Sequence, residues 1–249
     1  MSSNANENIK IARFIDISAC GEVFSEYYST FLIRSHKYYW NIEDPNKRDP
    51  KEFQVQGENG HMETGFGLLS CWTILKGEKP SDEEWKIFET DLPEKSPVIA
   101  IISSPQKVYN LLYKTLNIER KDGRTHPFFD PIKHKEVRYI DKSKEKLKGM
   151  PTIWDAIFTK DEKFIKENEY RFCVFHSAVF HEIIAYIFDV QNPYDYIDKC
   201  YFNPSSTKEN ASKLLKILSD APAGYGGGFS GKGLNEIIAN EDDLIACGI

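Results

Sequence analysis

Apolar and polar positions along this chain predict strands and helices that interleave. Continuous apolar, β-branched runs bounded by polar residues indicate strands, and amphipathic segments that open with serine or proline indicate helices. The expected strands lie at residues 29–35, 65–75, 96–104, 135–141 and 198–204, with one or two more strands within 169–190. The expected helices lie at 80–92, 104–116 and 205–221. Because no regular βαβ rhythm links them, we predict an α+β fold. Its sheet should be mixed and mostly antiparallel, with flanking helices.

Two of the expected helices carry recognisable starting signals. Ser81 is placed to be an N-cap, and Glu84 follows three residues later, as in a capping box. Ser205 or Ser206 should cap the helix at 205–221. Each signal predicts where a helix begins.

The chain of 249 residues suits one large domain. We expect a single domain over residues 1–220, in which about residues 1–10 form a flexible tail. Residues 221–249, which hold a run of glycines, should form a C-terminal extension. Residues 40–60 are rich in Pro, Asn, Asp and Gly, so they predict a long loop.

Composition narrows the functional classes. The net charge of −6 gives no broad attraction to nucleic acid. The five cysteines are scattered and form no Cys-x-x-Cys pair, so we expect a reduced, cytoplasmic chain without structural zinc or another metal. The polar N-terminus predicts no secretory signal, and no apolar run approaches the roughly 20 residues that span a bilayer, so we expect no membrane contact.

The most distinctive stretch is FIKENEYRFCVF, at residues 164–175. Glu167 and Glu169 are two residues apart, so both carboxylates should lie on one face at a strand entrance. Like charges this close indicate either a solvated edge or a site that uses the charge. Arg171 falls on the same face and could neutralise a carboxylate as an architectural salt bridge. Both interpretations stay open.

Several segments together resemble an uncharacterised bacterial family, a domain of unknown function, over about residues 30–218. The similar segments are SCWT, EEWKIFE, PVIAI, VRY, IFTKD, FIKENEYRF and YFNPSSTKENASKLLKIL. The family carries a Trp-x-x-Glu-x-Glu-Tyr-Arg box. Here Phe164 stands where that tryptophan is expected, while Glu167, Glu169 and the Tyr-Arg pair match. This resemblance implies no activity.

A second resemblance, to the ADP-ribosyltransferase fold, does imply one. That fold presents an Arg or His on an early strand, a Ser/Thr-rich strand and a Glu-x-Glu leading into a late strand, and its sheet is split. Arg34, the segment from Ser70 to Thr73, and the pair Glu167 and Glu169 follow this order. The resemblance implies that the chain consumes NAD as a substrate.

The implied roles follow from the chemistry of cleaving the nicotinamide–ribose bond. Glu169 would stabilise the oxocarbenium-like sugar, and Glu167 would orient or deprotonate the acceptor. Arg34 would bind the pyrophosphate, since its planar fork matches phosphate. The remaining expected contacts are a hydroxyl to ribose or to the glutamate and an aromatic ring on nicotinamide. The residues expected to make them are Ser70, Thr73, Tyr38, Tyr39 and Trp40.

Three functional hypotheses result. The first is an ADP-ribosyltransferase or NAD glycohydrolase with a protein or nucleic-acid acceptor; the resemblance implies a bacterial toxin or antiviral defence. The second is a non-catalytic sensor or partner-binding module of such a defence system, in which Glu169 pairs with Arg171. The third is a nucleic-acid-processing enzyme with a carboxylate-bound metal. Its candidate ligands are Glu167, Glu169, Asp155 and Asp161.

Overall fold

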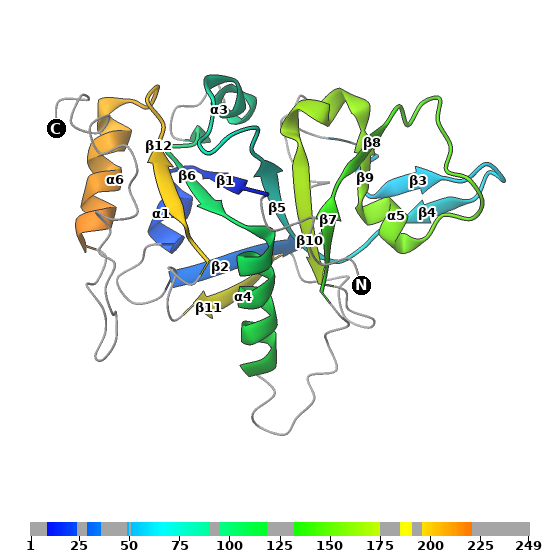
Figure 1. Ribbon diagram of the computed structural model, residues 1–249, viewed down its shortest axis with the longest axis horizontal. Coiled ribbons are helices and arrows are strands. Elements are labelled where there is room, and N and C mark those ends of the chain that lie inside the picture. Colours follow the sequence, from blue (N-terminus) through cyan, green and yellow to red (C-terminus); the bar gives the residue numbers. More distant parts are fainter. Residues whose placement is uncertain are drawn as a thin grey trace. The chain divides into compact units, whose positions relative to one another are not determined.

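Helices and strands of a computed structural model are drawn in Figure 1. The structure describes residues 9–23, 29–35, 49, 51–89, 95–118, 132–174, 185–190 and 196–220. The expectations for Tyr38, Tyr39, Trp40, the extreme N-terminus and the extension at 221–249 lie outside these residues. No helix in the described ranges is long and apolar enough to cross a membrane.

The chain divides into two compact units. Unit 1 comprises Met1–Phe31, Trp72–Leu111 and Phe188–Ile249, and unit 2 comprises Leu32–Cys71 and Leu112–Ile187. Strand β5 (Leu68–Ile74) contributes its first residues to unit 2 and its last to unit 1. The single domain expected over residues 1–220 stays a prediction.

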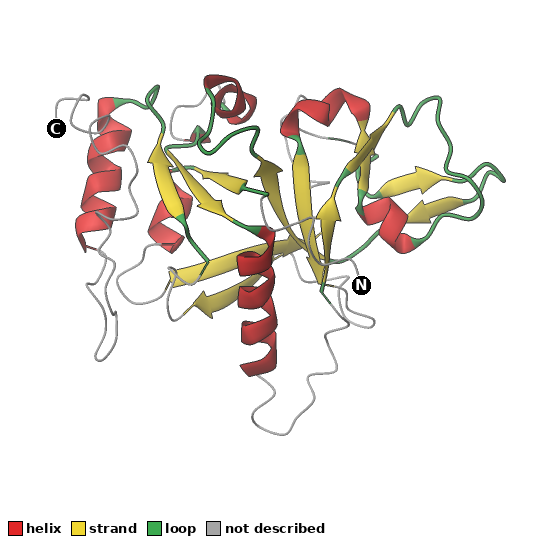
Figure 2. Cartoon of the chain, viewed as in Figure 1, coloured by secondary structure: helices red, strands yellow, loops and turns green. Residues whose placement is uncertain are grey.

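Unit 1 has an antiparallel sheet flanked by helices (Figure 2). In it β6 (Ile99–Ser103) lies between β1 (Ile11–Ile15) and β12 (Lys199–Phe202), and β1 also pairs with β5. All the residues of β6 are buried, as the apolar run predicted. The helices of this part of the chain are α1 (Ile17–Val23), α3 (Asp82–Phe88), α4 (Pro105–Ile118), which starts here, and α6 (Lys208–Asp220). Helix α1 packs against α6.

The helix starts agree in part with the sequence signals. Ser81 caps α3, and its hydroxyl and the Glu84 carboxylate complete the predicted capping box. The cap of α6 is different: Thr207 Oγ1 accepts a hydrogen bond from Asn210 N at 3.2 Å. The expected cap, Ser205 or Ser206, was wrong because Thr207 is the residue that directly precedes the helix.

Unit 2 contains strands β10 and β7, the first residues of β5 and the last residues of β2. Strand β5 pairs with β2 and with β10, and β10 pairs antiparallel with β7. The bounds are Ser29–Ser35 for β2, Glu169–Val174 for β10 and Lys133–Glu136 for β7. Strand β11 (Ala185–Val190) lies next to β2 in the order of hydrogen-bonded strands. The predicted α+β class with a mostly antiparallel sheet is thus confirmed, whereas the split sheet of an ADP-ribosyltransferase stays a prediction.

Two short sheets complete unit 2. Hairpin strands β3 (Gln54–Gln56) and β4 (Met62–Thr64) pair antiparallel and contact helix α5 (Ile153–Ile157). The long loop expected at 40–60 therefore contains strand β3, which is followed by the turn of the hairpin. Strands β8 (Arg138–Ile140) and β9 (Thr159–Asp161) pair in parallel, and the 3₁₀ helix η3 (Glu162–Glu167) follows β9.

The single strand expected at 135–141 is two strands, because the chain changes partners at Val137. Its amide donates to the carbonyl of Glu169 at 2.8 Å, and the next amide, of Arg138, donates to the carbonyl of Phe158 at 2.9 Å. Alternation of polar and apolar residues carries no information about such an exchange. This exchange places β9, and with it Lys160, beside the start of β10.

Candidate functional site

Charged side chains of unit 2 meet in a buried group, here called the Arg171 cluster. Its members are Glu52, Lys160, Glu167, Glu169 and Arg171. The side chains of all but Glu167 are at most 7% exposed, and Glu167 is 23% exposed. Burial this complete is rare for charged residues unless they are paired.

The ENEYR segment changes its backbone conformation between the two glutamates. Glu167 ends η3, Asn168 is left-handed with a φ of 44°, and Glu169 begins β10. Asparagine tolerates this conformation better than most residues. The prediction that the two glutamates share one strand face was therefore wrong. Glu167 reaches the cluster from the end of η3, and Glu169 reaches it from the start of β10.

Arg171 is the centre of the cluster. Its Nε donates to Glu169 Oε1 at 2.7 Å and its Nη2 to Glu169 Oε2 at 2.8 Å, which is a two-pronged pair on one strand face. Nη2 also donates to Glu52, and Nη1 donates to the carbonyl of Ile157 at 2.6 Å. The guanidinium lies over the ring of Phe53, 5.0 Å from its centroid. Each of the three guanidinium nitrogens of Arg171 thus donates at least one hydrogen bond.

Lys160 explains why two glutamates can stand so close. Its Nζ lies 2.7 Å from Glu167 Oε2, 3.4 Å from Glu169 Oε2 and 3.6 Å from Glu52 Oε2. The ammonium therefore occupies the space between three carboxylates. In the described residues, no group of histidine, cysteine or carboxylate side chains is arranged to hold a metal ion.

The pKa values follow these contacts. Burial alone would raise the pKa of Glu169, but Arg171 and Lys160 outweigh it and lower that pKa to about 2. Burial raises the pKa of Glu167, with Lys160 acting against the rise and Glu169 adding to it. Burial would lower the pKa of Arg171, yet Glu169 and Glu52 raise it well above the usual value. The cluster therefore holds Glu169 firmly ionised and makes Glu167 the carboxylate that takes up a proton more readily.

The surroundings of the cluster are strained and tightly bonded. Phe53, beside Glu52, is fully buried with a φ of 61°, a conformation that costs a residue with a side chain about 1–2 kcal/mol. The Tyr139 hydroxyl accepts a hydrogen bond from the amide of Glu169 at 2.8 Å. A second buried pair, Lys142 with Asp49 at 3.6 Å, lies in the same unit. The strained backbone of Phe53 is thus held among the hydrogen bonds and ion pairs of unit 2.

The three predicted site elements lie on strands that pair with one another: Arg34 on β2, Ser70 on β5 and Glu169 on β10. Their side chains do not all point to the same face of the sheet. Arg34 of β2 is paired in register with Leu69 of β5, and Leu69 and Cys71 share a face by strand alternation. A hydrogen bond from the Cys71 side chain helps to lower the pKa of Glu169. Ser70 is buried and points to the opposite face of β5 from Cys71. The residue of β5 that reaches Glu169 is therefore Cys71.

The other predicted ligands are not brought to the cluster within unit 2. Thr73 is a buried residue of unit 1 and pairs in register with Ala12 of β1. Tyr38 and Tyr39 lie outside the described residues, as stated above. Of the residues expected to act on NAD, the cluster itself contains Glu167 and Glu169.

Sequence reasoning missed the members of the cluster that come from elsewhere. Glu52 lies in the segment expected to be a loop, and Lys160 belongs to the Lys-Asp of IFTKD, which served only as a family signature. The one available signal for Lys160 is the number of carboxylates that follow it, at Asp161, Glu162, Glu167 and Glu169. Cys71 carried no signal beyond its place in a strand.

Comparison with family models, curated proteins and solved structures finds no match. Both resemblances stated for the sequence therefore stay predictions.

Proposed function

We propose that this chain is a non-catalytic binding module in which the ENEYR segment is an architectural clasp. One observation carries the proposal: both oxygens of Glu169 are taken up by Arg171, and the residue is 5% exposed. We propose a sensor or partner-binding role for it in a bacterial defence system, the setting that the resemblance to the ADP-ribosyltransferase fold implies.

The chemistry of NAD cleavage supports the same conclusion. A carboxylate that stabilises an oxocarbenium-like ribose must present an oxygen to the sugar. Glu169 Oε2 lies 2.8 Å from Arg171 Nη2 and 3.4 Å from Lys160 Nζ, so a sugar would have to displace a guanidinium or an ammonium. Removing one partner from a buried ion pair costs about 3–5 kcal/mol, which substrate binding would need to supply.

A second candidate, an NAD-consuming ADP-ribosyltransferase or glycohydrolase, keeps specific support. Arg34 and Glu169 lie on β2 and β10, two strands that both pair with β5. Glu167 is 23% exposed and its pKa is raised, which suits a general acid or base better than the ionised Glu169 does. In this reading NAD is the substrate, and a protein or nucleic acid is the acceptor.

Nicotinamide release separates the two candidates. The purified chain would be incubated with NAD, alone and with a cell lysate that supplies acceptors. The same assay would use Glu169→Gln, Glu167→Gln and, as a matched control, Glu162→Gln, which alters an exposed glutamate of η3. A binding module releases no nicotinamide in any sample. Release that is lost in Glu169→Gln or Glu167→Gln but kept in Glu162→Gln overturns the proposal in favour of the enzyme.

A further inference from the structure

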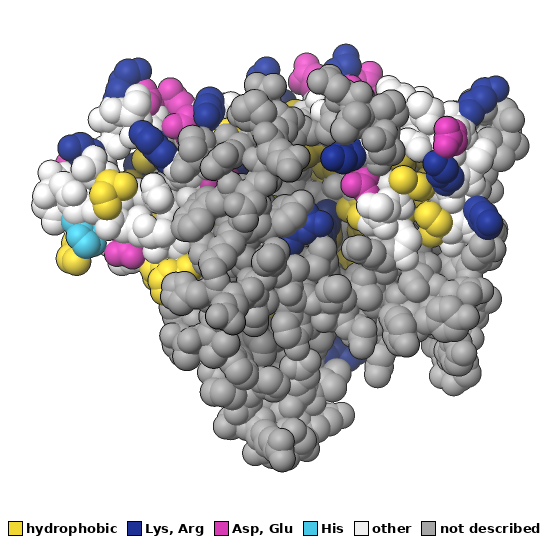
Figure 3. Space-filling view, turned by 180° about the vertical axis from the view of Figure 1, so that it is seen from behind, with side chains coloured by type: hydrophobic (Ala, Val, Ile, Leu, Met, Phe, Trp, Pro, Cys, Tyr) yellow, Lys and Arg dark blue, Asp and Glu magenta, His cyan; other side chains and the backbone are white. Residues whose placement is uncertain are grey.

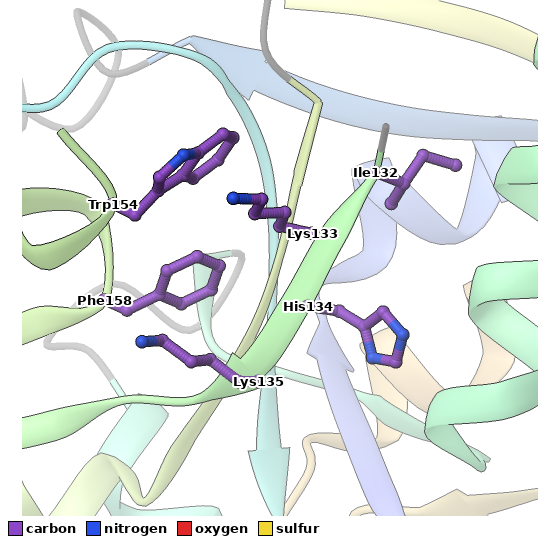
Figure 4. Close-up of a pocket in the computed structure, with 6 residues that line it drawn as sticks. All are labelled: Ile132, Lys133, His134, Lys135, Trp154 and Phe158. Atoms are coloured by element: carbon purple, nitrogen blue, oxygen red, sulfur yellow. The ribbon is translucent and has the colours of Figure 1, made fainter. Parts of the chain in front are cut away.

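A groove lies along β7 in unit 2. It encloses about 370 Å³ and is lined by Ile132, Lys133, His134, Lys135, Trp154 and Phe158. Figure 4 shows these side chains in place. This volume is near the lower end of the range of about 300–1,000 Å³ that small-molecule sites occupy.

Lysines and aromatic rings face each other in this groove. Strand alternation directs Lys133 and Lys135 to the same side of β7, toward Trp154 and Phe158, while His134 points the other way (Figure 4). Lys133 Nζ lies 4.1 Å from the centroid of the Trp154 ring, and Lys135 Nζ lies 4.9 Å from that of Phe158. The two rings are 6.5 Å apart with planes inclined by 26°. The ring of Phe158 is buried, at 2% exposed, whereas that of Trp154 is partly exposed. The groove therefore combines positive charge with the flat π surface of Trp154.

The two lysines of the groove have aromatic rings as their described partners. Both lysines are exposed, and in the part of the chain that the structure describes neither forms an ion pair with a carboxylate. Asp155 feels the charge of Lys135, but its Oδ2 accepts hydrogen bonds from the amide and hydroxyl of Thr152 at 2.8 and 2.7 Å. That carboxylate is fixed at the start of α5. An incoming anion would therefore complete the charge balance of the groove.

We propose that this groove binds a nucleotide, whose base stacks on Trp154 while its phosphate pairs with Lys133 and Lys135. Stacking of a base on an aromatic side chain contributes about 1–3 kcal/mol and tolerates any base. Each ammonium would move from its ring to the phosphate, since a charged partner attracts it more strongly than a ring does. The inference rests on the proposed binding module and names its ligand class.

A free nucleotide fits these observations better than a strand of nucleic acid. The groove is small, and the net charge of the chain is −6. On the described part of the face in Figure 3, basic side chains are interspersed with acidic ones instead of forming one basic field. A long polyanion needs such a field for tight binding.

Calorimetric titration of the full chain tests the inference. The ligands are AMP, ATP, NAD, adenosine without phosphate, and a short single-stranded oligothymidine. The test variant is Lys133→Gln/Lys135→Gln, which changes exposed side chains and so preserves the fold. The matched control is Lys163→Gln, because Lys163 also lies over an aromatic ring, 4.7 Å from the centroid of Phe164, but outside the groove.

We expect AMP and ATP to bind the wild type and the control alike, and the double variant at least tenfold more weakly. Adenosine should bind more weakly than AMP, because it lacks the phosphate. Binding of the oligonucleotide without binding of the free nucleotides would overturn the inference and assign the groove to a nucleic-acid strand.

Absence of binding by all five ligands, or equal affinity of the double variant, overturns the inference. The proposed function has a separate point of failure, since it fails on nicotinamide release that depends on Glu169 or Glu167. A titration without binding therefore refutes only the nucleotide groove and not the structural role of the ENEYR segment. Nicotinamide release that depends on Glu169 or Glu167 refutes the binding module, while the titration still decides whether the groove binds a nucleotide.

Discussion

Acid should remove the stabilisation that the Arg171 cluster gives to Glu169. The pKa of this carboxyl is lowered from an ordinary 4.5 to about 2, against the opposing effect of its burial, by Arg171 and Lys160. A carboxyl whose pKa is lower in the folded state stabilises the fold above its unfolded pKa, and the contribution is lost as the pH falls through the folded value. The relevant window therefore runs from about pH 4.5 down to about pH 2.

The magnitude follows from the pKa difference. One pKa unit corresponds to about 1.4 kcal/mol, so Glu169 contributes about 3 kcal/mol at neutral pH. Glu167 acts in the opposite direction, because its pKa is raised and its protonation favours the folded state. A comparison with Glu169→Gln, which keeps Glu167, isolates the first contribution from the other carboxylates of the chain.

Urea unfolding followed by fluorescence at several pH values measures this effect. The difference in the free energy of unfolding between wild type and Glu169→Gln should shrink by about 2–3 kcal/mol between about pH 7 and pH 2.5. A difference that stays constant within about 0.5 kcal/mol would refute the reasoning, since it would mean that Glu169 is not held ionised by its partners.

Other parts of the chain allow separate tests of the fold by thermal or urea unfolding. Ser81→Ala removes the cap of α3 and should cost about 1 kcal/mol, whereas Ser206→Ala, which alters no cap, should change little. Gly65→Ala places a methyl group 2.7 Å from Ile157 Cγ1 and should cost about 1–3 kcal/mol; Gly77→Ala, with nothing within 4 Å, is its near-neutral control. Asn168→Val should cost about 1–2 kcal/mol at a left-handed position that Asn168→Gly would preserve, and equal stabilities would contradict the role of Asn168.

Local signals predicted much of the fold. The buried strand β6 follows from an unbroken apolar run, and the start of α3 follows from the spacing of Ser81 and Glu84. Both are decided by residues close in sequence. The division at Val137 was missed because it depends on partner strands distant in the chain. Strand β3 was missed although its hairpin partner β4 is close in sequence, because the Pro, Asn, Asp and Gly residues of 40–60 predicted a loop.

The candidate site was predicted only at its centre. Glu169 and Arg171 are two residues apart on one strand, so their pairing could be anticipated from alternation alone. Glu52 joins them across 119 residues of sequence, and no local pattern marks such a contact. Ser70 was predicted to contact the ribose or Glu169 because of its hydroxyl group, but the neighbour of Glu169 is Cys71. The prediction did not consider that Ser70 and Cys71 point to opposite faces of β5.

The clasp itself is tested most directly by a double-mutant cycle with Arg171→Met, Glu169→Gln and the combined variant. Arg171→Met should cost about 3–5 kcal/mol of unfolding free energy, because it leaves buried carboxylates without their main partner. The account predicts that the double variant is more stable than the two single losses would add up to, by about 2–3 kcal/mol. A coupling energy below about 0.5 kcal/mol would contradict the clasp and leave Glu169 available for another role.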